Sequence, residues 1–263
     1  MFAPERISII KSYLRDRGQL DVHGISGMLN VSEVTIRRDL EKLEAEGFLQ
    51  RIHGGAMLST GENAATYVQS VAIDGEERAR QEEIARIALF MVSDGDVVFL
   101  LNGPINLVLA HRIAERNGVT VLTNDIRIAL EIAGQPRNKS VLVGGNLDCE
   151  SRALFGSLAL ANLRNFFVKR IFVELDAINE QLQFSVASQE KADLILEAAR
   201  CTEEKVVLCS AENFGKNAFC RLSGIEFADK IITNTNIADD YKRRIFEHDT
   251  QLYTSINAFE GST

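Results

Sequence analysis

Residues 32–56 read SEVTIRRDLEKLEAEGFLQRIHGGA, and this stretch decides the fold of the first part of the chain. Ser32 is suited to cap a helix, a helical pattern follows for about 14 residues, and Gly47 ends it. A short strand-like piece then leads to the pair Gly54-Gly55. Helix, strand and tight turn in this order are typical of the second half of a helix-turn-helix followed by a wing.

Two segments before this stretch supply the rest of the predicted unit. Residues 4–17 and 22–29 each place three apolar side chains on one helical face. Gly24 and Gly27 weaken the second of these helices by about 1 kcal/mol each relative to alanine. We therefore predict a winged helix-turn-helix domain over residues 1–57, a class that usually contacts duplex DNA.

The helix that follows Ser32 has two faces of different chemistry. At about 100° per residue, Ile36, Leu40 and Leu43 fall in one arc and are expected to face the core. Val34 and Ala45 lie beside the opposite arc, which carries a hydroxyl, a guanidinium and an ammonium group. The residues of this opposite arc are Thr35, Arg38 and Lys42.

This polar arc suits the major groove of DNA, because arginine pairs with guanine O6 and N7 and small apolar groups meet thymine methyls. Arg37 lies on the flank, where a phosphate contact is expected, although a surface pair with Glu33 is the plain alternative. Arg51 and His53 are expected to touch phosphate or the minor groove, with a solvated hairpin as their alternative. The predicted DNA-contacting residues are Ser32, Thr35, Arg37, Arg38, Lys42, Arg51 and His53.

The net charge of −8 is unevenly distributed. Residues 1–57 hold 8 basic and 8 acidic side chains, whereas the other 206 residues hold 21 basic and 29 acidic ones. All the excess acid thus lies outside the predicted DNA-binding unit, where it would repel DNA and confine contact to the small domain.

Length and composition indicate a globular protein with one large or two smaller domains, since 263 residues with 46% hydrophobic content can bury a sizeable core. No apolar run reaches the roughly 18–20 residues needed to cross a bilayer, and the amphipathic start is unlike a signal peptide. We therefore expect a cytoplasmic protein that does not bind a membrane.

The cysteines lack metal-ligand spacing, so we expect reduced thiols, no bound metal and no cofactor. They are Cys149, Cys201, Cys209 and Cys220.

Beyond a small, polar linker at residues 58–75, the pattern alternates between helix and strand over residues 76–263. Predicted strands of four to six apolar residues begin near 97, 119, 140, 170, 205, 230 and 250. Helices are predicted at 78–92, 104–116, 125–133, 153–164, 187–200 and 238–247. This alternation predicts an α/β domain with a mostly parallel sheet, in which ligands bind at the carboxyl ends of the strands.

The motif at residues 32–56 closely resembles the signature of the DeoR-type bacterial transcription regulators. The resemblance is strong over residues 3–58 and looser over 75–255. It implies a winged helix joined to a sensor domain that resembles the sugar-phosphate isomerase fold and binds rather than converts its ligand. Members usually repress operons of sugar or polyol catabolism, release DNA when a phosphorylated metabolite binds, and form dimers or tetramers. Operator DNA, a sugar-derived effector and further copies of the chain are therefore the expected partners.

The resemblance also implies an effector site, and here the sequence departs from the family. Where the family's first strand usually ends in D-S-G-T-T, residues 101–105 read LNGPI. The later D-x-S-K-F-G is SAENFG at residues 210–215, and G-x-D-G is ELDA at 174–177. The candidate effector-binding residues are Asn102, Gly103, Asn106, Thr123, Asn124, Asp125, Gly144, Gly145, Asp176, Glu190, Asn213 and Lys216.

These departures change the charge in one direction, since a lysine is lost and Glu174 and Glu212 are added. A phosphate dianion would meet a less favourable field there, unless Lys191 or Lys216 compensates. Backbone N–H groups after Gly103 remain suited to an anion. Three interpretations stay open: a less charged sugar derivative, a phosphosugar held mostly by main chain, or sequence drift that leaves the effector class of the family unchanged.

Other functions fit the sequence less well. An isomerase-like enzyme on the same sheet would need a positioned acid or base and a phosphate clamp, and Asp176 and Glu190 alone are weak evidence for either, so we predict no catalytic residue. A dinucleotide-binding redox sensor would need G-x-G-x-x-G, which residues 143–147 do not supply. A protein-binding winged helix is disfavoured by the basic arc around Arg38.

Overall fold

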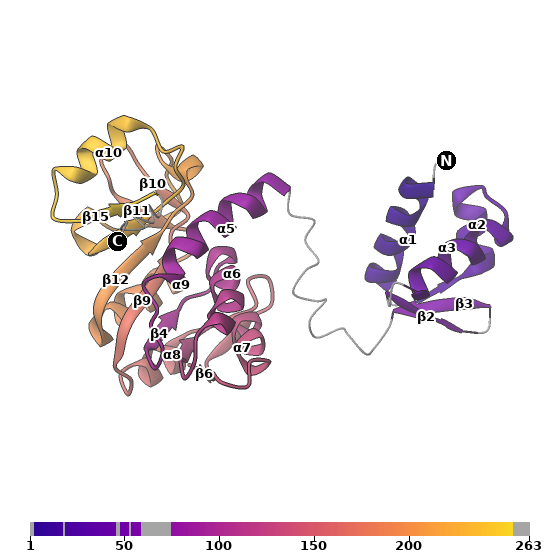
Figure 1. Cartoon of the computed structure of the whole chain (residues 1–263), viewed down its shortest axis with the longest axis horizontal. Coiled ribbons are helices and arrows are strands. Elements are labelled where there is room, and N and C mark those ends of the chain that lie inside the picture. Colours follow the sequence, from indigo (N-terminus) through magenta and orange to yellow (C-terminus); the bar gives the residue numbers. More distant parts are fainter. Residues whose placement is uncertain (1–2, 18, 46–47, 53, 59–74, 255–263) are drawn as a thin grey trace, which may run out of the picture. The chain divides into compact units, whose positions relative to one another are not determined.

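The computed structural model describes residues 3–17, 19–45, 48–52, 54–58 and 75–254. The chain divides into two compact units, residues 1–70 and 71–263 (Figure 1). Most of the predicted linker, residues 59–74, and the predicted wing residue His53 lie outside the described residues.

The first unit combines three helices with a small antiparallel sheet of strand order β1-β3-β2. The predicted helices and the strand-like piece before Gly54 are confirmed. Strand β1, which is too short to give a sequence pattern, and strand β3 are added to them. The elements are α1 (Ala3–Arg17), β1 (Gln19–Asp21), α2 (Val22–Leu29), α3 (Glu33–Ala45), β2 (Leu49–Ile52) and β3 (Gly55–Leu58).

The core of the first unit is built from the predicted arc of α3. Ile36, Leu40 and Leu43 are at most 1% exposed. They pack with apolar residues of α1, α2 and the sheet, among them Ile10 and Ile25. The helical periodicity therefore identified the buried side of α3 correctly, and its other side is left to solvent.

The wing depends on Gly55, at the point where β3 passes β1. A Cβ atom on Gly55 would lie 2.1 Å from the backbone carbonyl oxygen of Leu20. Leu20 pairs with Ala56 in the antiparallel register of β1 and β3. Only a residue without a side chain allows the two strands to approach this closely.

The second unit is an α/β domain with a seven-stranded sheet of order β15-β14-β12-β9-β4-β5-β6. All its pairings are parallel, as predicted. Its helices are α5 (Gly75–Leu89), α6 (Pro104–Arg112), α7 (Ile126–Ala133), α8 (Ser157–Leu163), α9 (Gln189–Ala198) and α10 (Asp239–Phe246). The sheet strands are β4 (Val97–Leu100), β5 (Thr120–Thr123), β6 (Lys139–Leu142), β9 (Val168–Glu174), β12 (Thr202–Leu208), β14 (Lys230–Ile232) and β15 (Gln251–Tyr253).

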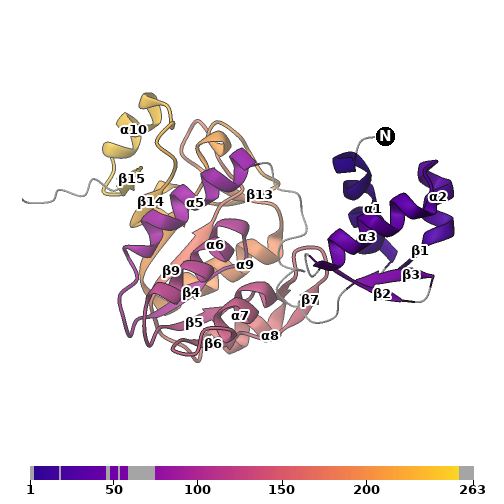
Figure 2. The ribbon, with the colours of Figure 1, turned by 45° about the vertical axis from the view of Figure 1, so that its right-hand side comes forward.

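The sheet is covered on both faces, because successive strand residues point to opposite sides. Val98 and Leu100 pack with helices α5, α6 and α7, which lie on the near side of the sheet in Figure 2. Phe99 packs into the second core with residues of α8 and α9. Both faces of the strands are therefore apolar, which explains their continuous hydrophobic runs.

The single helix predicted over residues 153–164 is wrong at its start. Residues 153–155 form a strand that pairs antiparallel with residues 146–148, and the helix begins only at Ser157. Gly156, with φ of 93°, separates the two, and Leu154 N–H donates to the backbone oxygen of Asn124 at 2.8 Å. Three consecutive apolar residues, 153–155, lie next to a helical run, and this concealed the boundary.

Short strands outside the main sheet were not predicted, since none exceeds four residues. Three of them form an antiparallel sheet of order β10-β11-β13. Short 3-10 turns occur at Ile113–Glu115, Ala199–Cys201, Ala211–Asn213 and Ile225–Phe227. These strands are β7 (Asn146–Asp148), β8 (Ala153–Phe155), β10 (Ala177–Ile178), β11 (Phe184–Val186) and β13 (Cys220–Ser223).

The described residues also bear on the expected membrane spans and thiols. No helix among them combines the length and the hydrophobicity needed to span a bilayer. The cysteines are free thiols: Cys209 and Cys220 are buried, Cys201 is half-buried and Cys149 is exposed.

Candidate DNA-binding surface and effector site

The start of α3 is fixed by Ser32, as the sequence predicts. Its hydroxyl oxygen accepts a hydrogen bond from Thr35 N–H at 3.2 Å and lies 2.9 Å from the Thr35 hydroxyl oxygen. This side chain satisfies a backbone donor that the first turn of a helix leaves free. Both hydroxyls thus sit at the exposed N-terminal end of α3, which is the end that a helix-turn-helix presents to bases.

The exposed face of α3 carries cations that are free to bind an anion. Arg38 and Lys42 are exposed, and neither forms an ion pair with any residue in the part of the chain that the structure describes. Val34, 62% exposed, adds an apolar group to the same end of the helix. Because no carboxylate has to be displaced, these side chains can reach base edges or phosphates directly.

Arg37 differs from Arg38, since it is already paired. Its guanidinium donates to the Glu33 carboxylate at 3.1 Å, one helical turn earlier. The same Glu33 lies 3.1 Å from His23 Nδ1 on α2. A phosphate contact by Arg37 therefore requires an exchange of partners, which lowers the gain from that contact.

The wing is attached to the C-terminal half of α3 by two carboxylates. Arg51 N–H donates to Glu44 at 2.9 Å, and the Arg51 guanidinium donates to Glu41 at 3.1 Å. These bonds hold β2 against α3 and leave Arg51 engaged in the free protein. The other predicted wing contact, His53, falls outside the described residues.

A buried ion pair in the first unit was missed by the sequence reading. Arg6 on α1 donates to both oxygens of Asp39 on α3, at 2.5 and 3.2 Å. The two side chains are 9% and 4% exposed. Two parallel bonds fix the orientation of α3 relative to α1. Asp39 is a polar residue next to the apolar arc of α3, and this position is the sequence signal that could have indicated its burial.

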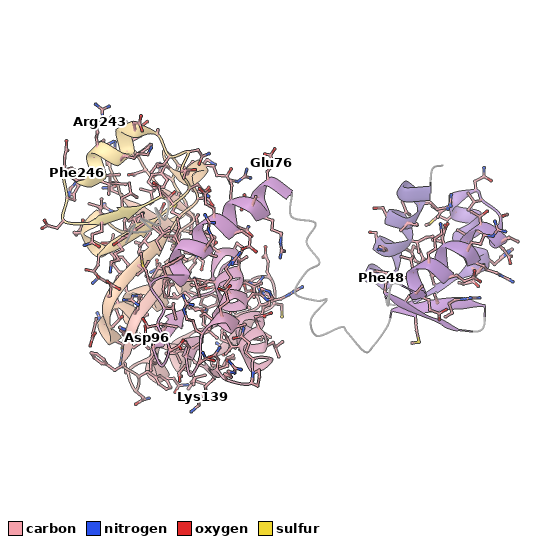
Figure 3. The ribbon with its side chains drawn as sticks, in the orientation of Figure 1. Phe48, Glu76, Asp96, Lys139, Arg243 and Phe246 are labelled. Carbon is pink, nitrogen blue, oxygen red and sulfur yellow. The ribbon has the colours of Figure 1, made fainter. Side chains whose placement is uncertain are left out.

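Most of the candidate effector residues lie at the carboxyl edge of the parallel sheet, in the loops that follow β4, β5, β6, β9 and β12. Thr123 is the last residue of β5, whereas Asn106 and Glu190 lie in the first turns of α6 and α9. Strand order reverses between β4 and β9, and such a reversal is where ligands bind in open α/β sheets. Asp96 and Lys139 mark the opposite, amino edge, far from Glu76 at the start of α5 (Figure 3).

Three asparagines join the loops and strands beside this reversal. Asn102 N–H donates to the Asn124 side chain at 2.9 Å, and the Asn124 amide donates back to Asn102 at 3.2 Å. Asn106 donates to the backbone oxygens of Leu101 and Phe172, at 2.9 and 3.0 Å, and so ties β4 to β9. These side chains are at most 7% exposed, so they hold the loops of this edge together and do not line its surface.

Glu174, the last residue of β9, lies at the reversal point itself. One oxygen of its carboxylate accepts hydrogen bonds from Ile105 N–H at 2.9 Å and Asn106 N–H at 3.3 Å, at the start of α6. Burial raises the pKa of this carboxyl to about 7, although nearby Lys191 and the two N–H donors act in the opposite direction. An acidic side chain therefore takes the place at the helix N-terminus where an anion would bind.

The cations nearest to Glu174 have carboxylate partners of their own. Lys191 on α9 lies 2.9 Å from Asp176. Arg127 on α7 lies 2.6 Å from Asp125, which is fully buried and also caps α7 through Arg127 N–H at 2.8 Å. Both of these cations are thus already paired with a carboxylate.

The remaining predicted residues differ in accessibility. The Thr123 hydroxyl is buried and accepts a hydrogen bond from Asp125 N–H at 3.0 Å. Gly145 allows close contact with β8, because a Cβ atom there would lie 2.5 Å from the Phe155 backbone oxygen. The residues that solvent reaches at least in part are Gly144, Gly145, Asp176, Glu190, Asn213 and Lys216.

A helix-turn-helix with unpaired cations on its exposed helix, followed by a parallel α/β domain with polar loops at a strand reversal, defines a ligand-responsive DNA-binding regulator. The chain belongs to the DeoR family. Residues 6–61 match the family profile described as the DeoR-like helix-turn-helix domain, and residues 76–235 match the DeoR C terminal sensor domain.

Curated relatives cover nearly the whole chain. An uncharacterized HTH-type transcriptional regulator, YgbI of Escherichia coli, is 26% identical over 98% of this chain and 100% of its own. The lactose phosphotransferase system repressor of Lactococcus lactis is 27% identical, covering 94% of this chain and 97% of its own. The HTH-type transcriptional repressor GlcR of Bacillus subtilis is 26% identical over 89% of both chains.

A solved structure gives a partial likeness. Ribose 5-phosphate isomerase A from Methanocaldococcus jannaschii is 14% identical, with a TM-score of 0.38, over 51% of this chain and 53% of that one. The curated relatives, by contrast, are named as regulators, so the isomerase-like enzyme is not the favoured function.

Proposed function

We propose that this regulator represses an operon of sugar or polyol catabolism and leaves its DNA when a sugar-derived effector binds the sensor domain. The observation that carries the DNA side of the proposal is the exposed face of α3, where Arg38 and Lys42 are unpaired within the described residues. The sugar-derived effector is supported by the names of two relatives, a lactose phosphotransferase system repressor and the transcriptional repressor GlcR.

In this proposal the sensor domains of at least two copies associate, as a dimer or a tetramer. Two recognition helices are then held at a spacing of one DNA turn or a multiple of it. Large apolar side chains beside the free edge of the sheet support such an interface. They are Leu130 on α7, Leu142 on β6 and Leu147 on β7, which are 51%, 40% and 50% exposed.

Helix α5, the first element after residues 59–74, is the proposed route between the two sites. Glu83 on α5 accepts hydrogen bonds from Asn234 at 2.7 Å and from Thr235 N–H at 3.1 Å, at the carboxyl edge of the sheet. Arg80 on the same helix lies 3.7 Å from Glu212 in the loop after β12. An effector that moves this loop would shift α5, and a coupling of about 1–3 kcal/mol would weaken DNA binding about 5–150-fold.

Substitution of the two neighbouring arginines tests the proposed base reader. Arg38→Ala is expected to cost about 1–3 kcal/mol of binding to a DNA site selected from a random library, and to relax the preference at one base position. Arg37→Ala should weaken all sequences alike and by less, because Arg37 must first leave Glu33. Titrations of matched and mismatched duplexes measure both effects; equal, sequence-independent losses would refute base reading by Arg38.

The Glu33–Arg37 pair gives a second prediction with the opposite sign. Glu33→Gln frees the Arg37 guanidinium for phosphate, so affinity should rise for every duplex and the salt dependence should steepen by about one counterion. The measurement is the slope of log affinity against log salt concentration. Glu180→Gln, at an exposed position of the second unit, is the matched control; a rise of the same size in that variant would contradict the phosphate contact.

The enzyme alternative is tested separately by assaying ribose 5-phosphate isomerisation with the purified chain. We expect no turnover above the rate without protein. Turnover that disappears in Asp176→Asn would instead assign this carboxylate a catalytic role.

A further inference from the structure

The start of α6 has the features of an anion site. Helix N-termini leave backbone N–H groups without an intrahelical acceptor, and the helix dipole favours negative charge there. The start of α6 also lies between β4 and β9, where the strand order reverses and a ligand is expected. Its N–H groups at Ile105 and Asn106 are nevertheless already bonded to Glu174.

We infer that Glu174 is the resident anion of the sensor domain and determines its specificity, so that the effector is an uncharged sugar or polyol with no phosphate or carboxylate at the α6 end. This inference rests on the proposed function, because it names the chemical class of the proposed effector. A phosphate could bind the same N–H groups only after it displaced the Glu174 carboxylate.

The Glu174 side chain occupies the space at the start of α6. The carboxylate lies directly over Gly103, where a Cβ atom would be 2.2 Å from its Oε2 atom and 2.6 Å from its carboxyl carbon. The backbone of the loop after β4 thus approaches the Glu174 side chain as closely as a glycine allows. The volume next to the two N–H groups is filled by the protein itself.

The cations that interact with Glu174 are already paired. Lys191 and Arg127 each lie within 2.9 Å of another carboxylate. A phosphate dianion would have to compete with these carboxylates for both partners. Hydroxyl groups of a sugar, by contrast, donate readily to the part-exposed Asp176 carboxylate.

The burial of the Glu174 carboxylate costs free energy. A buried carboxylate beside other carboxylates is held against its preference for water, as its raised pKa of about 7 indicates. The backbone donors that it satisfies could equally be satisfied by a ligand. Costly buried charges of this kind cluster at functional sites, which favours a role in ligand selection over a role in stability.

The test is isothermal titration calorimetry of the full chain at pH 8 with inorganic phosphate and D-glucose 6-phosphate as probes. Wild-type protein is expected to bind neither at millimolar concentration. Glu174→Ala vacates the helix start and should bind both at least about tenfold more tightly. Glu174→Gln removes the charge but keeps the volume, so its gain should be smaller than that of Glu174→Ala.

Glu180→Ala is the control, because it removes one exposed carboxylate outside the reversal point and should not gain phosphate binding. Circular dichroism establishes that each variant is folded. A wild-type chain that binds D-glucose 6-phosphate as tightly as Glu174→Ala overturns the inference, as does a folded Glu174→Ala variant that gains nothing. The proposed function would be contradicted by a different result, namely that the chain does not recognise DNA through α3. The calorimetry does not measure DNA recognition, so the two failures are distinguishable.

Discussion

Glu174→Gln is expected to stabilise the sensor domain at pH 8 by up to about 3 kcal/mol, and to leave its stability at pH 4 nearly unchanged. The pKa of Glu174 is about 7 in the folded chain, against 4.5 for an ordinary glutamate. Between these pH values the folded state holds a proton that the unfolded state has released, so the free energy of unfolding falls as the pH rises. Glutamine resembles the protonated carboxyl and has no proton to lose.

The groups that face Glu174 set the size of this effect. Lys191 and Arg127 favour its charged form, whereas Asp176 disfavours it. Burial, and after it the nearby Glu174 carboxylate, raises the pKa of the Cys209 thiol. Urea denaturation of wild-type and Glu174→Gln chains at pH 4, 6 and 8 measures the difference, with Glu180→Gln as the exposed control. A variant less stable than wild type at pH 8 would mean that the bonds to α6 outweigh the burial of the charge.

Gly55→Ala is expected to destabilise the DNA-binding unit by about 2–4 kcal/mol. The added methyl group would meet the backbone oxygen of Leu20 at 2.1 Å, and a backbone atom cannot move away as a flexible side chain can. Strand β3 would have to separate from β1. Since a unit of this size has only a few kcal/mol of stability, most of its DNA affinity should be lost as well.

Gly54→Ala is the matched control one residue earlier. Gly54 has φ of 81° and open space around its Cβ position, so an alanine there meets only the backbone strain of about 1–2 kcal/mol. Thermal unfolding followed by circular dichroism compares the two variants. Equal losses for both would show that strain in the turn, rather than the contact between β1 and β3, limits the wing.

Much of the first unit could be predicted from the sequence, because its signals are local. A capping serine and apolar residues at helical spacing were enough to place α3 and to separate Arg38 from Ile36. Strand β1 and the Arg6–Asp39 pair were not predicted, since both depend on contacts between segments far apart in the sequence. The sequence also suggested a Glu33–Arg37 pair as an alternative, and the structure contains it.

The effector site was harder to predict, because it is assembled from loops after five strands. The sequence correctly placed Glu174 near a strand end and identified the change in charge. It did not reveal that this carboxylate accepts bonds from the start of α6. Nor did it distinguish side chains that build the edge, such as Asn102 and Asn106, from those that solvent reaches, such as Lys216. That distinction depends on burial, which residue type alone does not determine.

Genomic footprinting with the intact chain tests the central claim, that this protein reads DNA sequence through the exposed face of α3. We expect protection of a small number of short sites upstream of genes for sugar or polyol catabolism, and loss of these sites with Arg38→Ala under conditions where the variant is folded. Protection that is spread evenly over the genome, or that is unchanged by Arg38→Ala, would contradict the account.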